Sequence, residues 1–243
     1  MLIPILAYLS DRLPFGNSLR GISSEKLEEM MRRSKAPAWH EYAIKSRKWR
    51  KHACTACRWL KEALPTTASI FEPGCGSGAN LLWLGQQGFR NLSGSDIEEG
   101  ALELGRNLAS MLALPLEVWT DDSMNPVRMP EELDAILSVN WLYHIPQASL
   151  GDFLALYRET LKIGGYLACD MVTRRYDAVP GNQWHTKDRG LPVEQRRPSE
   201  YTMRLDPEEV SSIAVRHGFA TLRSTCFALS QPQRAVYLLR RVE

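Results

Sequence analysis

The fold is decided by the stretch Glu72-Pro73-Gly74-Cys75-Gly76-Ser77-Gly78, which lies between an apolar run at 68–72 and a helical pattern at 80–87. Glycine at alternate positions lets the backbone turn tightly and lets a ligand approach it without obstruction from a Cβ atom. Asp96 stands 20 residues after Gly76, at the end of the next predicted strand. A carboxylate in that position can accept hydrogen bonds from both hydroxyls of a ribose. The stretch therefore predicts a nucleotide-type site at a strand-to-helix turn.

The rest of the chain alternates between short apolar runs and longer amphipathic ones. Strands are predicted at 68–72, 91–95, 116–120, 133–139, 166–172, 219–227 and 234–242. Helices are predicted at 80–87, 100–112 and 150–162, and from a capping-box start at Asp206 to Gly218. This alternation predicts an α/β protein with a doubly wound, Rossmann-like sheet, and it places ligands at the carboxyl ends of the strands.

Composition excludes several classes of protein. The chain has 243 residues, of which 44% are hydrophobic and 24% charged, and this favours a globular domain over a disordered or fibrous protein. Five cysteines, an odd number, do not suggest the disulfide framework of a secreted protein. The apolar start of the chain contains Pro4, is too short to span a bilayer, and lacks the pattern of a signal peptide. We therefore expect a cytoplasmic protein without a membrane anchor.

Residues 1–65 predict a helical extension in front of a main domain at 66–243. Helices are expected at 23–33 and, between Pro37 and Pro65, at 38–64. Residues 32–62 contain ten Lys or Arg and two Glu, a local excess of +8 in a chain whose net charge is +2. A stretch of this kind either binds nucleic acid or is a solvated helix surface, and the second is the commoner case.

The Gly-rich turn and the acids after it resemble the class I S-adenosylmethionine-dependent methyltransferases, over residues 65–172 and the closing helix and strands. The resemblance implies a seven-stranded sheet with an antiparallel last strand, and S-adenosyl-L-methionine as cofactor. It implies a cofactor site made of the turn, the acids after the second and third strands, and the motif after the fourth. These residues are Glu72, Gly74, Cys75, Gly76, Gly78, Asp96, Ile97, Asp121, Asp122, Ser123, Asn140 and Trp141. Asp122 fits the position after the third strand best, and Asp121 is the near alternative.

An NAD site is another interpretation of the turn, because Gly74-x-Gly76-x-x-Ala79 fits the dinucleotide fingerprint. The chain has no separate catalytic domain and no Tyr-x-x-x-Lys pair, and an acid directly before the glycines is typical of the methyltransferase turn. We therefore favour S-adenosylmethionine. A basic side chain from the helical extension is expected to hold the cofactor carboxylate, and Arg47 and Arg50 are the candidates.

Two stretches are expected to face the transferred methyl group. The first is 140–146, where Tyr143 is predicted to line the pocket and His144 either accepts a proton from the nucleophile or packs against the next helix. The second is the connection 173–206, whose 34 residues without periodicity predict a substrate-binding insert. The insert contributes His185 as a further candidate catalytic residue.

The insert also predicts the class of substrate. It contains seven Lys or Arg beside several aromatic residues, and guanidinium groups pair well with carboxylates and phosphates. We therefore expect direct methyl transfer to a small anionic metabolite. The predicted substrate contacts are Tyr143, His144, Arg174, Arg175, Tyr176, His185 and Tyr201. No metal site is expected, because Cys54 and Cys57 are accompanied by no second Cys pair and no zinc-type His spacing.

Two other functions stay open at this point. An RNA or ribosomal methyltransferase would use the basic stretch to follow phosphates, although Asn140-Trp141-Leu142-Tyr143 differs from the Asn/Asp-Pro-Pro-aromatic run used on exocyclic base amines. A cofactor-binding subunit without transferase activity is the second alternative. The oligomeric state and the methylated atom, oxygen, nitrogen or sulfur, are open as well.

Overall fold

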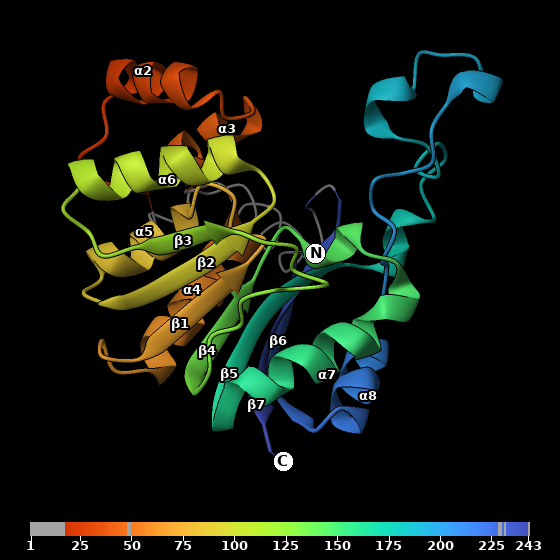
Figure 1. Cartoon of the computed structure of the whole chain (residues 1–243). Helices are drawn as coiled ribbons and strands as arrows, with labels where there is room; N and C mark the ends of the chain where they lie inside the picture. Colours follow the sequence, from red (N-terminus) through yellow and green to blue (C-terminus); the bar gives the residue numbers. More distant parts are fainter. Residues whose placement is uncertain (1–17, 48–49, 228–229, 231, 243) are drawn as a thin grey trace, which may run out of the picture.

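The computed structural model describes residues 18–47, 50–227, 230 and 232–242 (Figure 1). In these residues a seven-stranded sheet has the order β3-β2-β1-β4-β5-β7-β6. The strands are β1 Ser69–Pro73, β2 Asn91–Asp96, β3 Glu117–Thr120, β4 Leu133–Ser138, β5 Leu161–Val172, β6 Phe219–Phe227 and β7 Arg234–Arg241. The first five strands pair in parallel, whereas β7 is antiparallel to both β5 and β6. This confirms the predicted Rossmann-like sheet with an antiparallel last strand.

The helices lie close to the predicted ranges, with one exception. They are α2 Ser24–Ser34, α3 Trp39–Lys45, α4 Lys51–Ala63, α5 Ala79–Gln86, α6 Glu99–Met111, α7 Leu150–Thr160 and α8 Pro207–Arg216. The prediction of one helix at 38–64 is wrong, because α3 ends at Lys45 and α4 begins at Lys51. The break allows the side chain of Arg47 to be fully buried against α4 and α5. Residues 48–49 of that predicted helix, and 1–17 of the predicted extension, lie outside the described residues.

Helices cover both faces of the sheet, as Figure 1 shows. On one face α4, α5 and α6 pack around the side of β1 that carries Ile70. On the other face α7 and α8 enclose Phe71, the next residue of β1, together with Phe153 and Val210. Successive side chains of a strand point to opposite faces, so a strand covered on both faces is apolar throughout. The central position of β1 explains why Ile70 and Phe71, which point to opposite faces, are both buried.

Two segments lie beyond the carboxyl ends of the strands. The helix pair α2 and α3 lies over α6, where Leu27 packs with Leu104 and Leu108. The insert at 173–206 follows the carboxyl end of β5 and lies away from α2 and α3 (Figure 1). It contains three short 3-10 helices, at Arg174–Tyr176, Thr186–Asp188 and Val193–Gln195. The described part of the chain contains no helix with the length and apolar character needed to cross a bilayer.

Candidate active site

The Gly-rich turn joins β1 to α5 and has the form of a cradle. Gly74, Gly76 and Gly78 have φ values of 66°, 54° and 64°, in the left-handed region that favours glycine. A Cβ atom at Gly76 would lie 2.7 Å from Cε1 of His40, and one at Gly74 would lie 2.5 Å from the ring of Trp141. Both the backbone conformation and the available space therefore require glycine in this turn.

Asp96 lies beside the turn because β2 is the neighbour of β1. Its Oδ2 accepts a hydrogen bond from the backbone N–H of Gly76 at 2.7 Å, and its Oδ1 accepts one from the N–H of Glu98 at 3.0 Å. The register then pairs Asp96 with Thr120 at the end of β3. A carboxylate can accept about four hydrogen bonds, so the half-buried Asp96 retains capacity for ligand hydroxyls.

Glu72 lies buried at the start of the turn. Its Oε1 accepts a hydrogen bond from Nδ2 of Asn80 at 2.6 Å, whereas its Oε2 has no partner among the described residues. Burial raises the pKa of Glu72 to about 8. Arg47 donates hydrogen bonds to Oδ1 of Asn80 and to Sγ of Cys57, the latter at 3.2 Å. The buried guanidinium of Arg47 thus positions Asn80 below the turn, and its contact with the cofactor carboxylate stays a prediction.

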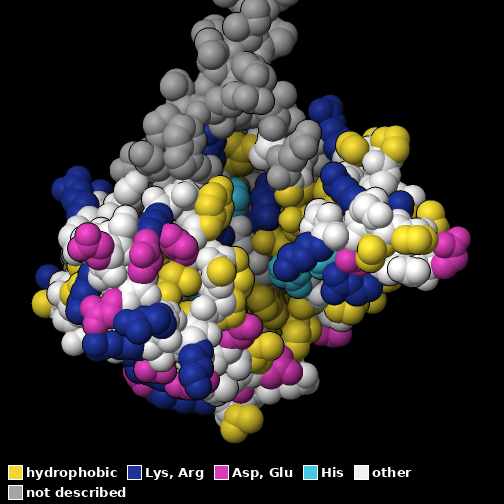
Figure 2. All heavy atoms as spheres, turned by 90° about the horizontal axis from the view of Figure 1, so that it is seen from above, with side chains coloured by type: hydrophobic (Ala, Val, Ile, Leu, Met, Phe, Trp, Pro, Cys, Tyr) yellow, Lys and Arg dark blue, Asp and Glu magenta, His cyan; other side chains and the backbone are white. Residues whose placement is uncertain are grey.

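Two cavities adjoin at this edge of the sheet. A small cavity of about 30 Å³ lies against Glu72, Gly74 and Cys75, and a large one of about 760 Å³ extends toward the insert. Trp39, Arg50 and Asn140 line both cavities. Figure 2 shows a hollow on this face with His and Lys or Arg side chains around it. The three shared residues mark the place where a ligand of one cavity would meet a ligand of the other.

Arg50 is the positive charge at this junction. Burial lowers its pKa, and the positive charges of Arg47 and Arg234 act in the same direction. No acidic side chain in the described part of the chain forms an ion pair with it. A cation that has lost its hydration without gaining a counter-ion is unfavourable, so this position favours an anionic ligand.

Asn140 is the centre of a hydrogen-bond network at the junction of the two cavities. It has a φ of 65°, and its backbone N–H donates to Oδ1 of Asp170 at 2.6 Å. Its side-chain Oδ1 lies 2.5 Å from Nε2 of His52 and accepts from the guanidinium of Arg234 at 3.0 Å. Arg234 also donates to Oδ2 of Asp170 at 2.8 Å and to the hydroxyl of Tyr143 at 3.1 Å. These bonds hold Asn140 between the two cavities in one orientation.

The charges in this network are set by burial and by Arg234. Burial lowers the pKa of His52 to about 3 and raises the pKa of Tyr143 to about 12, so both groups are neutral at pH 7. Burial by itself would raise the pKa of Asp170, but the Arg234 guanidinium holds the pKa of this carboxyl below its usual value. Arg234 and Asp170 therefore form a buried ion pair in the floor of the large cavity.

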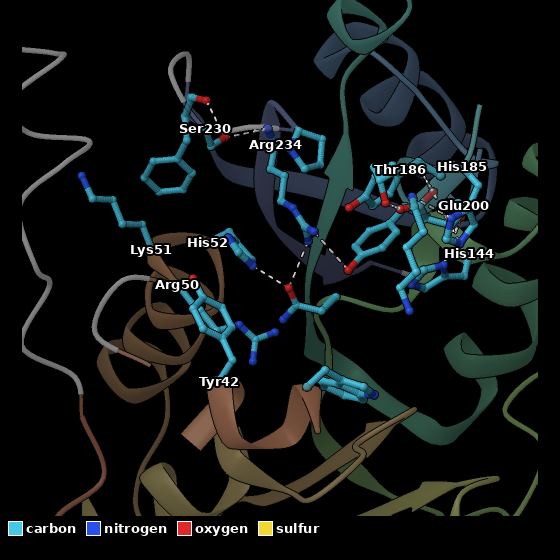
Figure 3. Close-up of a pocket in the computed structure, with 17 residues that line it drawn as sticks. Tyr42, Arg50, Lys51, His52, His144, His185, Thr186, Glu200, Ser230 and Arg234 are labelled. Atoms are coloured by element: carbon cyan, nitrogen blue, oxygen red, sulfur yellow. Dashed lines mark hydrogen bonds and ion pairs between the residues drawn. The ribbon is translucent and has the colours of Figure 1, made fainter. Parts of the chain in front are cut away.

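His144, His185, Thr186 and Glu200 lie on the opposite side of the large cavity (Figure 3). Nδ1 of His144 lies 3.0 Å from the backbone oxygen of Glu200, which can only accept a hydrogen bond. The proton is therefore on Nδ1, and Nε2 is free to accept another. Burial lowers the pKa of His144, so its ring is neutral at pH 7. Nδ1 of His185 accepts the N–H of Lys187 at 3.2 Å.

The structure separates the other predicted cofactor residues from the two cavities. Ile97 is 71% exposed beside Asp96. The carboxylate of Asp121 accepts backbone hydrogen bonds from residues 127 and 128, and that of Asp122 accepts one from residue 124. Both carboxylates thus stabilise the loop after β3, while the buried Ser123 accepts a hydrogen bond at its carbonyl from Tyr157. Their roles toward the cofactor remain predictions.

The predicted residues of the insert also divide into two groups. The guanidinium of Arg174 donates to both carboxylate oxygens of Glu209 at 2.6 Å, so the structure gives no support to a substrate contact of Arg174, which stays a prediction. Tyr201 lines the large cavity together with Tyr143, whose ring centroid is 5.3 Å away. Arg175 and Tyr176 instead line a further cavity next to the large one.

Several residues of the site were not among the predicted ones. They are Trp39, His40, Tyr42, Lys51, His52, Asp170, Thr186 and Arg234. Asp170 was the most accessible to prediction, because it is an acid near the carboxyl end of a predicted strand. Arg234 is the first residue of the antiparallel strand β7. It therefore lies at the same edge of the sheet as the carboxyl ends of the parallel strands. Nothing in the sequence distinguishes His52 from other helical polar residues.

The described residues contain no group of three or more His, Cys, Asp or Glu arranged to hold a metal ion. Cys54 and Cys57 are buried in α4, and burial raises the pKa of Cys57 to about 12. Cys57 is thus a neutral thiol at pH 7.

Comparison with known proteins gives one match in sequence and many in structure. Residues 70–165 match the family model of a methyltransferase domain. This range extends from β1 through the Gly-rich turn and Asp96 to the first residues of β5. No curated protein matches the chain.

Solved structures of similar fold cover most of the chain. Magnesium protoporphyrin IX methyltransferase from Synechocystis PCC 6803, solved with bound S-adenosylhomocysteine, is 13% identical with a TM-score of 0.63 and covers 98% of this chain and 94% of its own. A protein from Methanosarcina mazei described as a SAM-dependent methyltransferase is 16% identical, with a TM-score of 0.62 and coverage of 75% and 96%. TehB from Haemophilus influenzae is 17% identical, with a TM-score of 0.57 and coverage of 77% and 61%. At these identities the likeness is one of fold.

Proposed function

Because this chain is a class I S-adenosylmethionine-dependent methyltransferase, we propose that it methylates a small anionic molecule bound in the large cavity. The bound cofactor supplies a methyl group on a sulfonium, which is already strongly electrophilic. The protein therefore has to align the nucleophile, exclude water and accept a proton where the nucleophile carries one.

The residues around the Gly-rich turn fit this cofactor. Glu72 offers an ammonium group a buried oxygen that has no partner among the described residues. Arg50, which forms no ion pair with a described residue, offers its guanidinium to a carboxylate. Asp96 is the acceptor for the ribose hydroxyls, and the exposed Ile97 next to it is an apolar surface for the adenine. The small cavity of about 30 Å³ cannot hold the whole cofactor, so the α3 side chains that lie over Gly76 must shift when it binds.

The chemistry of the large cavity is the observation that carries the proposed substrate class. Its basic lining residues are Arg50, Lys51, Lys187 and Arg234, together with three histidines, whereas Glu200 is the one acidic residue among the described lining residues. Tyr42, Tyr143 and Tyr201 add aromatic surface. A concave site with excess positive charge attracts an anion, and its aromatic walls favour a substrate with a flat or apolar part.

His144 is the proposed proton acceptor of this site. Its free Nε2 and its neutral ring suit it for accepting a proton from a hydroxyl or an amine. Asn140 lies where the two cavities adjoin, so its network fixes the wall along which donor and acceptor would meet. These positions suit direct transfer of the methyl group from the cofactor to a nucleophile in the large cavity.

The basic stretch gives little support to the RNA alternative. Arg47 is fully buried, Arg50 and Lys51 line the large cavity, and Lys45 pairs with both Glu28 and Glu41. A face that follows a nucleic-acid backbone needs several basic side chains free on one surface. Four of the described basic residues of 32–62 are instead buried, in the cavity lining or in a surface ion pair.

The proposal is tested by calorimetry with S-adenosylmethionine and by transfer of its labelled methyl group to a fractionated metabolite extract. We expect the label in the acidic fraction, and we expect Asp96→Ala to weaken cofactor binding by about 10-fold or more, because a charged acceptor of buried hydrogen bonds is lost. Asp152→Ala, which removes an exposed carboxylate on α7, is the matched control. Label only in neutral or RNA fractions would exclude the proposed substrate class.

A further inference from the structure

The cavity lined by Arg175 and Tyr176 has a volume of about 510 Å³ and adjoins the large cavity. Thr186, Tyr201 and Ser230 line both. The ring of Tyr201 lies 5.3 Å from that of Tyr143 on one side and 5.1 Å from that of Tyr176 on the other. A continuous aromatic wall therefore leads from the large cavity into this second cavity.

The second cavity contains positive charge without a compensating acid. Arg175 and Arg189 line it, and no Asp or Glu is found among its described lining residues. Arg189 is oriented by a hydrogen bond of 2.9 Å to Oδ1 of Asn182, which is buried. Asn182 is itself fixed by donating to the backbone oxygen of Tyr176 at 2.8 Å. One of the two arginines is thus held in place by a buried side chain.

Other arginines of the insert differ from these two. Arg174 pairs with Glu209, Arg197 with Asp188, and Arg204 with Asp177. Within the described part of the chain, neither Arg175 nor Arg189 forms an ion pair. Three arginines of the insert are therefore neutralised by acids, whereas the two that line the second cavity have no acidic partner among the described residues.

Tyr176 provides a second, independent indication of a ligand. Its side chain is 5% exposed and lines the second cavity, yet its hydroxyl has no hydrogen-bond partner among the described residues. A buried hydroxyl without a partner costs free energy, and a ligand oxygen would satisfy it. Two guanidinium groups and a hydroxyl donor together form a suitable site for a carboxylate or a phosphate.

We propose that this second cavity binds an ionised end group, carboxylate or phosphate, of an elongated substrate whose nucleophile lies in the large cavity. The inference rests on the proposed function, since the same substrate occupies both cavities. Arg175 and Arg189 bind the end group, Tyr176 donates a hydrogen bond to it, and Tyr201 packs against the apolar middle of the substrate.

Calorimetry with matched probes tests this subsite without methyl transfer. The probes are 4′-hydroxybiphenyl-4-carboxylate, the corresponding 4-phosphate monoester, and uncharged 4-hydroxybiphenyl. We expect Arg175→Ala and Arg189→Ala each to weaken binding of the charged probes by about 10-fold and to leave binding of the uncharged probe unchanged, because each variant loses a charge-assisted hydrogen bond to the end group. Tyr176→Phe should act in the same direction. The carboxylate and the phosphate arms identify which end group the subsite prefers.

Arg174→Ala is the control. It removes the same charge from the neighbouring residue, whose side chain is paired with Glu209. Equal weakening of charged and uncharged probes by Arg175→Ala, or an equal effect of Arg174→Ala, would overturn the subsite. Those results would leave methyl transfer to an acid untouched. Conversely, failure to label any acidic metabolite would contradict the proposed substrate class even if Arg175 binds the charged probes.

Discussion

Nε2 of His52, on α4, lies 2.5 Å from Oδ1 of Asn140, which follows β4. The amide oxygen can only accept, so Nε2 of His52 carries the proton and Nδ1 is left as an acceptor. The same oxygen accepts from Arg234, and Asp170 holds the backbone N–H of Asn140. Asn140 is thereby held at a φ of 65°, a backbone conformation that residues other than glycine rarely adopt.

Substitution of Asn140 should separate its two roles. Asn140→Ala removes the acceptor shared by His52 and Arg234 and leaves the left-handed backbone strained, whereas Asn140→Gly removes the acceptor and relieves the strain. We expect both variants to lose turnover, with the glycine variant more stable by about 1 kcal/mol. Urea unfolding and rate measurements on the two proteins check this. Equal stability would show that the φ value carries no strain.

The pH dependence of stability should report the buried Glu72. Its pKa is raised from 4.5 to about 8 by burial, so between these pH values the folded chain holds a proton that the unfolded chain has lost. The unfolding free energy of the wild type should therefore fall as pH rises from about 4.5 to about 8, relative to Glu72→Gln. Chemical denaturation at several pH values measures the difference. Parallel curves for the two proteins would contradict the raised pKa.

Binding of the cofactor should release a proton through the same carboxyl. If an ammonium group binds Glu72, it favours the ionised form and lowers the pKa of this carboxyl from about 8. Calorimetry at pH 7 in buffers of different ionisation enthalpy measures the number of protons released on binding. Glu72→Gln should abolish this release, while Asp152→Ala should keep it. Identical binding enthalpies in all buffers for the wild type would contradict the prediction.

The rate should depend on pH through His144. Because burial lowers the pKa of His144 below 6.5, its neutral, proton-accepting form persists to lower pH than for an exposed histidine. Turnover should thus rise with pH through a value below 6.5 and be constant at neutral pH. His144→Gln should lower turnover by about 100-fold and remove this dependence. A wild-type profile retained in His144→Gln would transfer the role to His52 or His185, and a flat profile in every variant would indicate a sulfur nucleophile.

Removing only one partner of the Arg234–Asp170 ion pair should strongly destabilise the folded protein. Asp170 is fully buried, so Arg234→Met leaves an uncompensated carboxylate in the interior. We expect a loss of about 3–5 kcal/mol in the free energy of unfolding, and recovery of a large part of it in Arg234→Met/Asp170→Asn. Guanidinium unfolding of the single and double variants provides the comparison. Additive losses would mean that the two groups do not stabilise one another.

Much of the fold could be predicted because it follows from local patterns. Alternating runs of fixed period determined the strands and most helices, and the glycines from Gly74 to Gly78 identified the turn. The helix predicted at 38–64 was wrong because its apolar spacing continues through a break. Burial of Arg47 against Asn80 and Cys57 is a tertiary contact, and residue spacing contains no information about it.

By itself, the sequence predicted the strands and the class of cofactor, because strand period, a Gly-rich turn and an acid at the next strand end are local features. Only the tertiary structure decided which side chains share a cavity. It brings His52, Asn140, Asp170 and Arg234 together from four separate elements, and it distinguishes Arg175, which lines a cavity, from Arg174, which pairs with Glu209. Adjacent arginines are equivalent in composition and charge, and only their burial and their partners in three dimensions give them different roles.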